Sequence, residues 1–200
     1  MCGRYYVDDD TAREIEKVIR QVDEKLSREA AGGIRLKAGD VHPTDTAPVL
    51  LASDRKLCCA WQRWGFDGFD KKQVIFNARS ESALEKKMFR ESVRHRRIVV
   101  PATRFYEWNR KKEKNIFCRN DHTALFMAGF YNRYGDEDRF VILTTAANAS
   151  MQPVHDRMPL ILEPDEIVPW ILDDGKTEQI LHKTPCLLER RCEFEQISFF

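Results

Sequence analysis

The sequence has no stretch of apolar residues that approaches the ~18 that a membrane-spanning helix needs. We therefore expect no membrane contact. The start, MCGRYYVDDD, has no apolar core and becomes acidic at once, unlike a secretory signal peptide. These absences predict a cytoplasmic location, on the nucleoid if the source is bacterial.

Metal-binding spacing is also missing. No two of the six cysteines are separated by two residues, and the adjacent pair Cys58 and Cys59 suits neither a zinc knuckle nor an ordinary disulfide. The histidines show no metal-ligand spacing either. We therefore expect free thiols in a reducing compartment, no metal and no cofactor.

The chain lacks an excess of charge of one sign, because 33 basic and 32 acidic side chains leave a net charge of +1. That total argues against a nucleic-acid binder, which usually carries a positive excess. The charges are nevertheless segregated: residues 86–119 carry a net charge of +9 and residues 120–200 a net charge of −7. Screening acts over about 8–10 Å, so such a basic block can attract phosphate even on a neutral chain. On charge alone, a solvated face paired with the acidic segment explains the block equally well.

Hydrophobic spacing predicts few helices. The clearest covers residues 11–31, where apolar residues recur at helical spacing and Thr11 and Glu14 can form a capping box. Two further helices are expected at residues 82–94, with its apolar residues facing inward, and at residues 165–172.

Most of the remaining chain reads as strands. Short apolar runs bounded by turn residues predict strands at 49–52, 57–61, 74–76, 98–100, 105–108, 116–118, 125–131 and 140–144. Because these strands mostly do not alternate with helices, we expect an α+β fold with mainly antiparallel strands in a sandwich or barrel-like sheet, flanked by a few helices. No repeat or linker interrupts the chain, so residues 1–200 are expected to form one domain and a monomer.

Cys2 is the first candidate for chemistry. Removal of Met1 would leave an α-amine and a thiol on one residue, with ordinary pKa values of about 7.7–8 and 8.5, so that both are partly reactive near neutral pH. Such an aminothiol condenses with an aldehyde to an imine, and the thiol then closes a thiazolidine ring. Cys2 could also be an ordinary N-terminal nucleophile or an unremarkable second residue.

Three further positions carry acid–base or anion-binding groups. Glu107 lies between aromatic residues on an expected strand, where desolvation should raise its pKa and suit it to proton transfer. His155 sits in a loop between two prolines with Arg157 close behind it. Asn77 ends a strand and precedes Arg79, which offers a phosphate fork. Each also has an ordinary structural explanation as a paired strand residue, a solvated loop residue or a turn.

Together these segments resemble one family. The motifs are MCGR at the start, WGF at 64–66, NARSE at 77–81, PA at 101–102 with FYEW at 105–108, LFMAG at 125–129, TAAN at 145–148 and HDRMP at 155–159. In this order and spacing they are similar to those of SOS-response-associated peptidase (SRAP) domains, over residues 2 to about 172.

The resemblance implies that the chain binds single-stranded DNA at abasic sites and that Cys2 forms a covalent thiazolidine crosslink with the abasic-site aldehyde. It implies autoproteolytic removal of Met1, lyase-like chemistry and protection of the lesion. By position, Cys2 would be the nucleophile, Asn77 would position its amine, Glu107 would shuttle protons, and His155 would protonate the sugar oxygen or help to reverse the link. The implied DNA contacts are Arg4, Pro43, Trp64, Phe69, Arg79, Thr145 and Arg157.

Two departures from the family pattern affect the DNA contacts. Where the family often has Asn-Val-Ala-Pro, residues 40–43 read Asp-Val-His-Pro, so no asparagine is present there to contact DNA. A tryptophan pair that the family often places beyond Trp-Gly-Phe is reduced here to Phe69, which offers less stacking area.

Two other functions remain open. The first is a thiol peptidase acting in trans with Cys2, His155 and Glu107. The second is a non-catalytic single-strand binder that uses only the basic block and the aromatic side chains.

Overall fold

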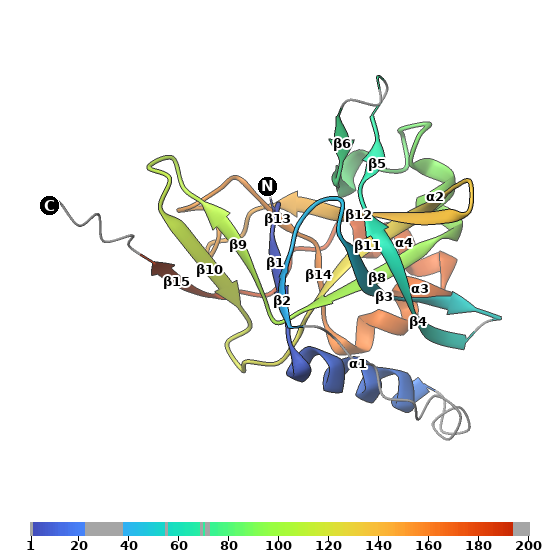
Figure 1. The fold of residues 1–200 in the computed structure, drawn as a ribbon, viewed down its shortest axis with the longest axis horizontal. Coiled ribbons are helices and arrows are strands. Elements are labelled where there is room, and N and C mark those ends of the chain that lie inside the picture. The colour runs from blue at the N-terminus through green and yellow to red at the C-terminus, as the bar shows by residue number, and fades with distance from the viewer. Residues whose placement is uncertain (1, 23–37, 55, 69, 71–72, 194–200) are drawn as a thin grey trace, which may run out of the picture.

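The computed structural model describes residues 2–22, 38–54, 56–68, 70 and 73–193. Five strands close into a ring at its centre, in the order β12-β4-β3-β8-β11 with β11 pairing back to β12 (Figure 1). The pairing of β12 with β4 is parallel, and the other pairings in the ring are antiparallel. The bounds are β3 Thr46–Ser53, β4 Lys56–Trp64, β8 Arg97–Ala102, β11 Leu125–Tyr134 and β12 Glu137–Ala146.

Short strands extend this barrel. Two of them pair with β12 and one with β11, while two more form a separate ribbon. They are β7 Asn77–Arg79 and β13 Arg157–Pro159 on β12, β14 Ile161–Leu162 on β11, and the ribbon of β5 Phe66–Asp67 and β6 Val74–Ile75. β7 and β13 place the Asn77 and His155 segments on the same strand of the barrel.

A second sheet lies beside the barrel, with strands in the order β15-β10-β9-β1-β2 (Figure 1). Its strands are β1 Tyr5–Val7, β2 Gly39–Val41, β9 Arg104–Trp108, β10 Lys114–Cys118 and β15 Glu189–Glu193. All its pairings are antiparallel. β1 therefore runs beside β9, which brings the start of the chain next to Glu107.

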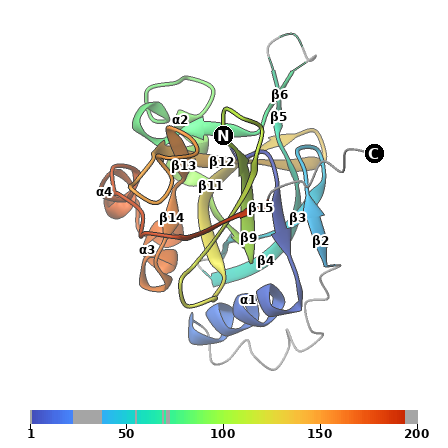
Figure 2. The same cartoon turned by 90° about the vertical axis from the view of Figure 1, so that its left-hand side faces the viewer.

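Four α-helices occur in the part of the chain that is described. The long one, α1, lies below the barrel in both views, and the three short ones lie on the side of the barrel away from the second sheet (Figures 1 and 2). They are α1 Asp9–Val22, α2 Arg90–His95, α3 Ile167–Leu172 and α4 Thr177–Leu181, joined by the 3₁₀ turns η2 Ser80–Ser82, η3 Pro164–Glu166 and η4 Asp174–Lys176. None of these helices is long and apolar enough to cross a membrane.

The barrel and its neighbours share one core of buried apolar side chains. Trp64 is fully buried, stacks on Phe140 with ring centroids 6.2 Å apart, and lies 5.1 Å from Tyr5 of the second sheet. Its indole nitrogen donates a hydrogen bond to the Phe76 carbonyl, which satisfies the polar group of a buried tryptophan.

The expected α+β fold with mainly antiparallel, barrel-like strands is confirmed, and each of the eight expected strands overlaps an observed one. Two helix predictions need correction. The first helix begins at Asp9, not at residue 11, and residues 23–31 of the expected span lie outside the described residues. The expected helix at 82–94 is a turn followed by the short α2, with Met88 exposed rather than inward.

Candidate functional site

The pairing of β1 with β9 positions Cys2. Tyr5 lies opposite Phe105 in the antiparallel register, and the Tyr106 amide donates to the Arg4 carbonyl at 3.0 Å. Continuing this register by two residues carries Cys2 past Glu107 to the end of β9. The register thus brings Cys2 close to Glu107, near the hairpin that joins β9 to β10.

The Cys2 thiol is enclosed, with 1% of the residue exposed. It donates a long hydrogen bond of 3.6 Å to the Arg4 carbonyl. Burial, together with the negative charge of Glu107, raises the pKa of Cys2 to about 12. The group is therefore a neutral thiol at physiological pH and needs a proton acceptor before it can act as a thiolate.

Asn77 fixes the backbone of Cys2 through a hydrogen bond. Its side-chain amide nitrogen donates to the Cys2 carbonyl at 2.8 Å. The side-chain oxygen of Asn77 is buried and has no hydrogen-bond partner among the described residues. Because a buried amide oxygen without a partner costs free energy, this atom is a ready acceptor for a ligand N–H or O–H group.

Glu107 is buried in the middle of the second sheet, with 6% of the residue exposed. It lies opposite Asn115 of β10 in the register and between the aromatic residues Tyr106 and Trp108. A carboxylate in such surroundings is poorly solvated, and it acts on the Cys2 thiol strongly enough to shift that pKa. The two groups are electrostatically coupled.

His155 lies in the loop that leads into β13. Its Nδ1 atom is 2.8 Å from an Asp156 carboxylate oxygen, and the Arg157 amide donates to the same nitrogen at 3.0 Å. These two contacts fix the orientation of the imidazole ring at the start of β13.

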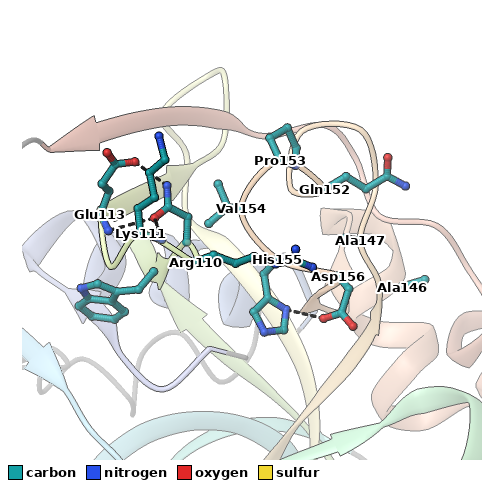
Figure 3. A pocket seen from close by; sticks show the side chains of 12 residues that line it. Arg110, Lys111, Glu113, Ala146, Ala147, Gln152, Pro153, Val154, His155 and Asp156 are labelled. Atoms are coloured by element: carbon teal, nitrogen blue, oxygen red, sulfur yellow. Dashed lines mark hydrogen bonds and ion pairs between the residues drawn. The ribbon is translucent and has the colours of Figure 1, made fainter.

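A pocket of about 970 Å³ opens between this loop and the hairpin that joins β9 to β10. Figure 3 shows Lys111 and Glu113 on one side and His155 and Asp156 on the other. The lining residues are Trp108, Asn109, Arg110, Lys111, Glu113, Ala146, Ala147, Gln152, Pro153, Val154, His155 and Asp156. The pocket thus lies between the basic β9–β10 hairpin and His155, the expected acid–base residue. Two of its lining residues, Trp108 and Ala146, directly follow Glu107 and Thr145 in the sequence.

The three arginines expected to contact DNA are in different states. Arg157 is held by Glu81 in a two-pronged ion pair of 2.7 and 2.9 Å, which lowers the pKa of Glu81. Arg4 lies 3.5 Å from Asp40, with its guanidinium 5.2 Å from the centre of the Trp108 ring. Arg79 is exposed and forms no ion pair with another described residue.

The Glu81 ion pair could not be found from sequence spacing, because its partners are 76 positions apart. Glu81 meets Arg157 only because β7, which ends two residues before Glu81, and β13, which begins at Arg157, both pair with β12. The sequence likewise does not predict Gln152 as a residue that lines the pocket. It lies in the loop that ends at His155, and no residue pattern distinguishes it.

The other four expected DNA contacts lie in varied surroundings. Trp64 needs correction, because its fully buried ring packs in the core and cannot stack on a base. Thr145 is also largely buried, with 7% exposed. Pro43 is half-buried in the turn after β2, and Phe69 lies outside the described residues.

Comparison with known proteins identifies the family. The sequence model described as "SOS response associated peptidase (SRAP)" matches residues 1–198. The abasic site processing protein YoqW of Bacillus subtilis is 33% identical over 188 residues, which cover 86% of this chain and 80% of that protein. The abasic site processing protein YedK of Escherichia coli is 27% identical over 80% of this chain and 76% of that protein. HMCES of Xenopus tropicalis, also named an abasic site processing protein, is 29% identical over 67% of this chain and 53% of its own length.

Solved structures show the same architecture. A protein from Bacteroides thetaiotaomicron superposes with a TM-score of 0.76 at 22% identity, over 97% of this chain and 93% of that one. A phage-related protein from Bordetella bronchiseptica gives a TM-score of 0.76 at 20% identity, over 96% and 94% of the two chains. With the fold shared and the family model matched over almost the whole length, this chain belongs to the SRAP family.

Proposed function

We propose that this protein processes abasic sites in single-stranded DNA by forming a covalent bond between Cys2 and the aldehyde of the opened sugar. The observation that carries the proposal is that buried Cys2 contacts the Asn77 amide and lies close enough to the Glu107 carboxylate to be affected by its charge. The names of the related proteins, all abasic site processing proteins, support the choice of substrate.

The reaction requires cleavage of the peptide bond before Cys2, which frees its α-amine; the family name is consistent with self-cleavage at this bond. The amine adds to the aldehyde and loses water to give an imine. The Cys2 sulfur then adds to the imine carbon while the thiol proton passes to the nitrogen, which closes a thiazolidine ring. No oxidant or cofactor enters this balance.

The side chains of Asn77 and Glu107 suit different steps of this reaction. Asn77 holds the Cys2 carbonyl at 2.8 Å, so the amine is anchored, and its free side-chain oxygen is available to the amine or the sugar. Glu107 acts as the proton shuttle, since the thiol starts protonated and a carboxylate is coupled to it. A neutral thiol also favours the order in which the amine reacts first.

The groups around the pocket serve the sugar and the phosphates. His155 can give a proton to the sugar oxygen, because its imidazole ring lines the pocket in which we place the substrate. Arg79 is exposed and ready to bind a phosphate, whereas Arg157 must exchange the Glu81 carboxylate for one. We assign to Arg4 and Thr145 supporting contacts with the DNA.

The peptidase alternative is less well supported. A thiol peptidase of this kind needs a low-pKa, accessible cysteine, whereas burial raises the pKa of Cys2. A purely non-catalytic binder would leave the buried polar cluster around Cys2 without a role. The basic residues of the β9–β10 hairpin are consistent with both the crosslinking function and the non-catalytic DNA-binding function.

Intact-mass spectrometry tests the proposal. The purified protein, checked for a free Cys2 amine, is incubated with a single-stranded oligonucleotide that carries one abasic site. We expect a single adduct that lacks one water relative to the two reactants. Glu107→Gln should form it more slowly.

Two Cys2 variants separate the steps. Cys2→Ala should form no stable adduct, and Cys2→Ser should form only an imine that borohydride traps, because its hydroxyl closes the ring poorly. The matched control is Cys192→Ser, which alters an exposed thiol and should react like the wild type. An undiminished stable adduct in Cys2→Ala would overturn the mechanism, as would an equal adduct with undamaged DNA.

A further inference from the structure

A second cluster of reactive side chains lies at the other end of the second sheet. Cys118, His122 and Glu189 each offer one ligand atom, and these atoms all lie within 4.8 Å of one another. The Cys118 sulfur is 3.9 Å from one Glu189 carboxylate oxygen, and the His122 Nδ1 atom is 3.9 Å from the same oxygen. One carboxylate oxygen therefore faces both a thiol and an imidazole.

The cluster is produced by strand pairing. Cys118 and Glu189 are direct partners in the antiparallel register of β10 and β15. His122 follows in the turn after β10, with a left-handed φ of 57°, and its amide donates to the Arg119 carbonyl at 3.0 Å. Sequence spacing gave no hint of a metal site because Glu189 comes from a distant strand.

We propose that Cys118, His122 and Glu189 bind one divalent transition-metal ion, with zinc as the best match. A thiolate, an imidazole and a carboxylate are the three ligand types that zinc takes in proteins, and the mixture of soft and hard donors disfavours calcium and magnesium. On binding, the ion replaces the thiol proton of Cys118, which leaves to solvent.

The distances suit this ion after a modest contraction. Ligand bonds of about 2.0–2.3 Å at tetrahedral angles place neighbouring ligand atoms roughly 3.3–3.7 Å apart. The two contacts of 3.9 Å need to close by only a fraction of an ångström. The ligand atoms of Cys118 and His122 lie within 4.8 Å of each other and need to close by at most about 1.5 Å. His122 is exposed, so its side chain is free to adjust, and the fourth position of the ion opens to water.

Arg191 shapes the site in two ways. Its Nε atom lies 2.8 Å from the other Glu189 oxygen, which orients the carboxylate and leaves the first oxygen facing Cys118 and His122. Outer groups that orient a ligand in this way are common around protein metal ions. The positive charge of Arg191 also opposes the cation, so we expect weaker binding than at a closed four-ligand zinc site.

The metal site is separate from the proposed reaction at Cys2. Along β10, Cys118 is three residues from Asn115, the partner of Glu107 in the register. At about 3.3 Å per residue, this places the two sites on the order of 10 Å apart along the strand. The ion would tie β15 to β10 without touching the buried cluster.

Titration of the full-length protein with zinc alone, against a chromophoric chelator, tests the site. We expect one ion per chain, and a fall in affinity of at least about tenfold in both Cys118→Ser and His122→Gln. Cobalt serves as a second probe, because thiolate coordination gives it a charge-transfer absorption that Cys118→Ser should abolish. Circular dichroism without metal shows whether each variant is folded.

Cys192→Ser is the matched control, since it removes an exposed thiol from the same strand as Glu189 and should leave zinc affinity unchanged. The proposal is overturned if the wild type binds no stoichiometric zinc. It is equally overturned if folded Cys118→Ser and His122→Gln bind zinc as tightly as the wild type.

Discussion

At the scale of single residues, the thiol that we propose as the nucleophile lies where ionisation is unfavourable. Cys2 is buried beside the Glu107 carboxylate, and both features disfavour the thiolate. A reactive cysteine that were always ionised would be open to oxidation and stray electrophiles. In the proposed reaction, the thiol would therefore lose its proton only when the substrate and a proton acceptor are both in place.

The raised pKa has a consequence for stability. The folded state holds the Cys2 proton up to about pH 12, whereas the unfolded chain releases it near the ordinary value of 9.0. The unfolded state therefore binds fewer protons in this window, and the free energy of unfolding falls as the pH rises from 9.0 toward 12. Cys2→Ala should show a shallower fall, measured by urea unfolding below and above pH 9.0. Equal slopes in the two proteins would contradict the raised pKa.

At the scale of elements, the first helix is fixed by a cap one turn earlier than its sequence pattern predicts. The Asp8 carboxylate accepts from the Thr11 amide at 3.0 Å, and the Thr11 hydroxyl accepts from the Asp8 amide at 3.4 Å. Thr11 also contacts Thr103, between β8 and β9, through a hydroxyl pair at 2.7 Å. The cap thus fastens α1 to the sheet region that carries Glu107.

Removing this cap should cost stability. Asp8→Ala leaves the Thr11 amide and hydroxyl without their carboxylate acceptor, and we expect a loss of about 1 kcal/mol in the free energy of unfolding. Chemical denaturation measures the change. Asp10→Ala is the control, because Asp10 is exposed and its ion pair with Arg13 lies on the helix surface, where such pairs contribute little. The cap assignment fails if the two variants lose the same amount.

The sequence predicted the strands well and the segment before α2 poorly. Apolar runs bounded by turns mark the barrel strands because both faces of a strand such as β8 are buried. Residues 82–94 have helical spacing, yet the Arg90 side chain donates to the carbonyls of Leu84 and Glu85, which a helix would pair with backbone amides. Very short strands such as β13 and β14 carry too few residues for a pattern.

The sequence likewise predicts one part of the candidate site and not the rest. Cys2, Asn77 and Glu107 were chosen from their motifs, and the contacts of Cys2 bring the three together. The ion pair of Arg157 with Glu81 depends on strand register, which local sequence does not encode. Trp64 was misassigned because a motif tryptophan looks the same whether it packs in the core or stacks on a base.

At the scale of the whole molecule, closure of the barrel depends on close packing across its strands. Gly129 of β11 lies opposite Ile142 of β12, and a Cβ atom there would sit 2.6 Å from the Val141 carbonyl oxygen and 3.3 Å from Ile98. These neighbours belong to the strands on either side. The glycine therefore lets three strands approach one another.

We expect Gly129→Ala to lower the free energy of unfolding by about 1–3 kcal/mol, because the methyl group meets backbone that cannot move aside. Thermal and denaturant unfolding measure the loss. Gly175→Ala is the control, since its new Cβ would meet only the end of the Asp173 side chain at 3.1 Å. A Gly129→Ala protein as stable as the wild type would show that the barrel can relax.

The charge distribution gives a prediction about DNA binding. Arg110 and Lys111 are exposed at the pocket rim within the +9 segment. Arg110→Ala with Lys111→Ala should weaken binding to single strands and reduce the slope of log K against log salt by about 0.7 for each phosphate that the variant no longer neutralises. Fluorescence anisotropy at several salt concentrations measures this slope.

Arg133→Ala is the control for this measurement. Its side chain is exposed in the hairpin of β11 and β12, which extends to the opposite side of Figure 1 from the β9–β10 hairpin. Its salt slope should equal that of the wild type. An unchanged slope in the double variant would place the DNA elsewhere.

The ring of strands also sets an order of events during translation. β4 is made early, yet its parallel neighbour β12 ends only at Ala146, so the barrel cannot close until that residue has left the ribosome. Pairings between such distant segments form slowly. Asn77 reaches its place through β12, so the Cys2 backbone gains this hydrogen bond only after most of the chain has been synthesised. The nascent protein therefore carries an unsheltered thiol, and maturation of the site coincides with completion of the barrel.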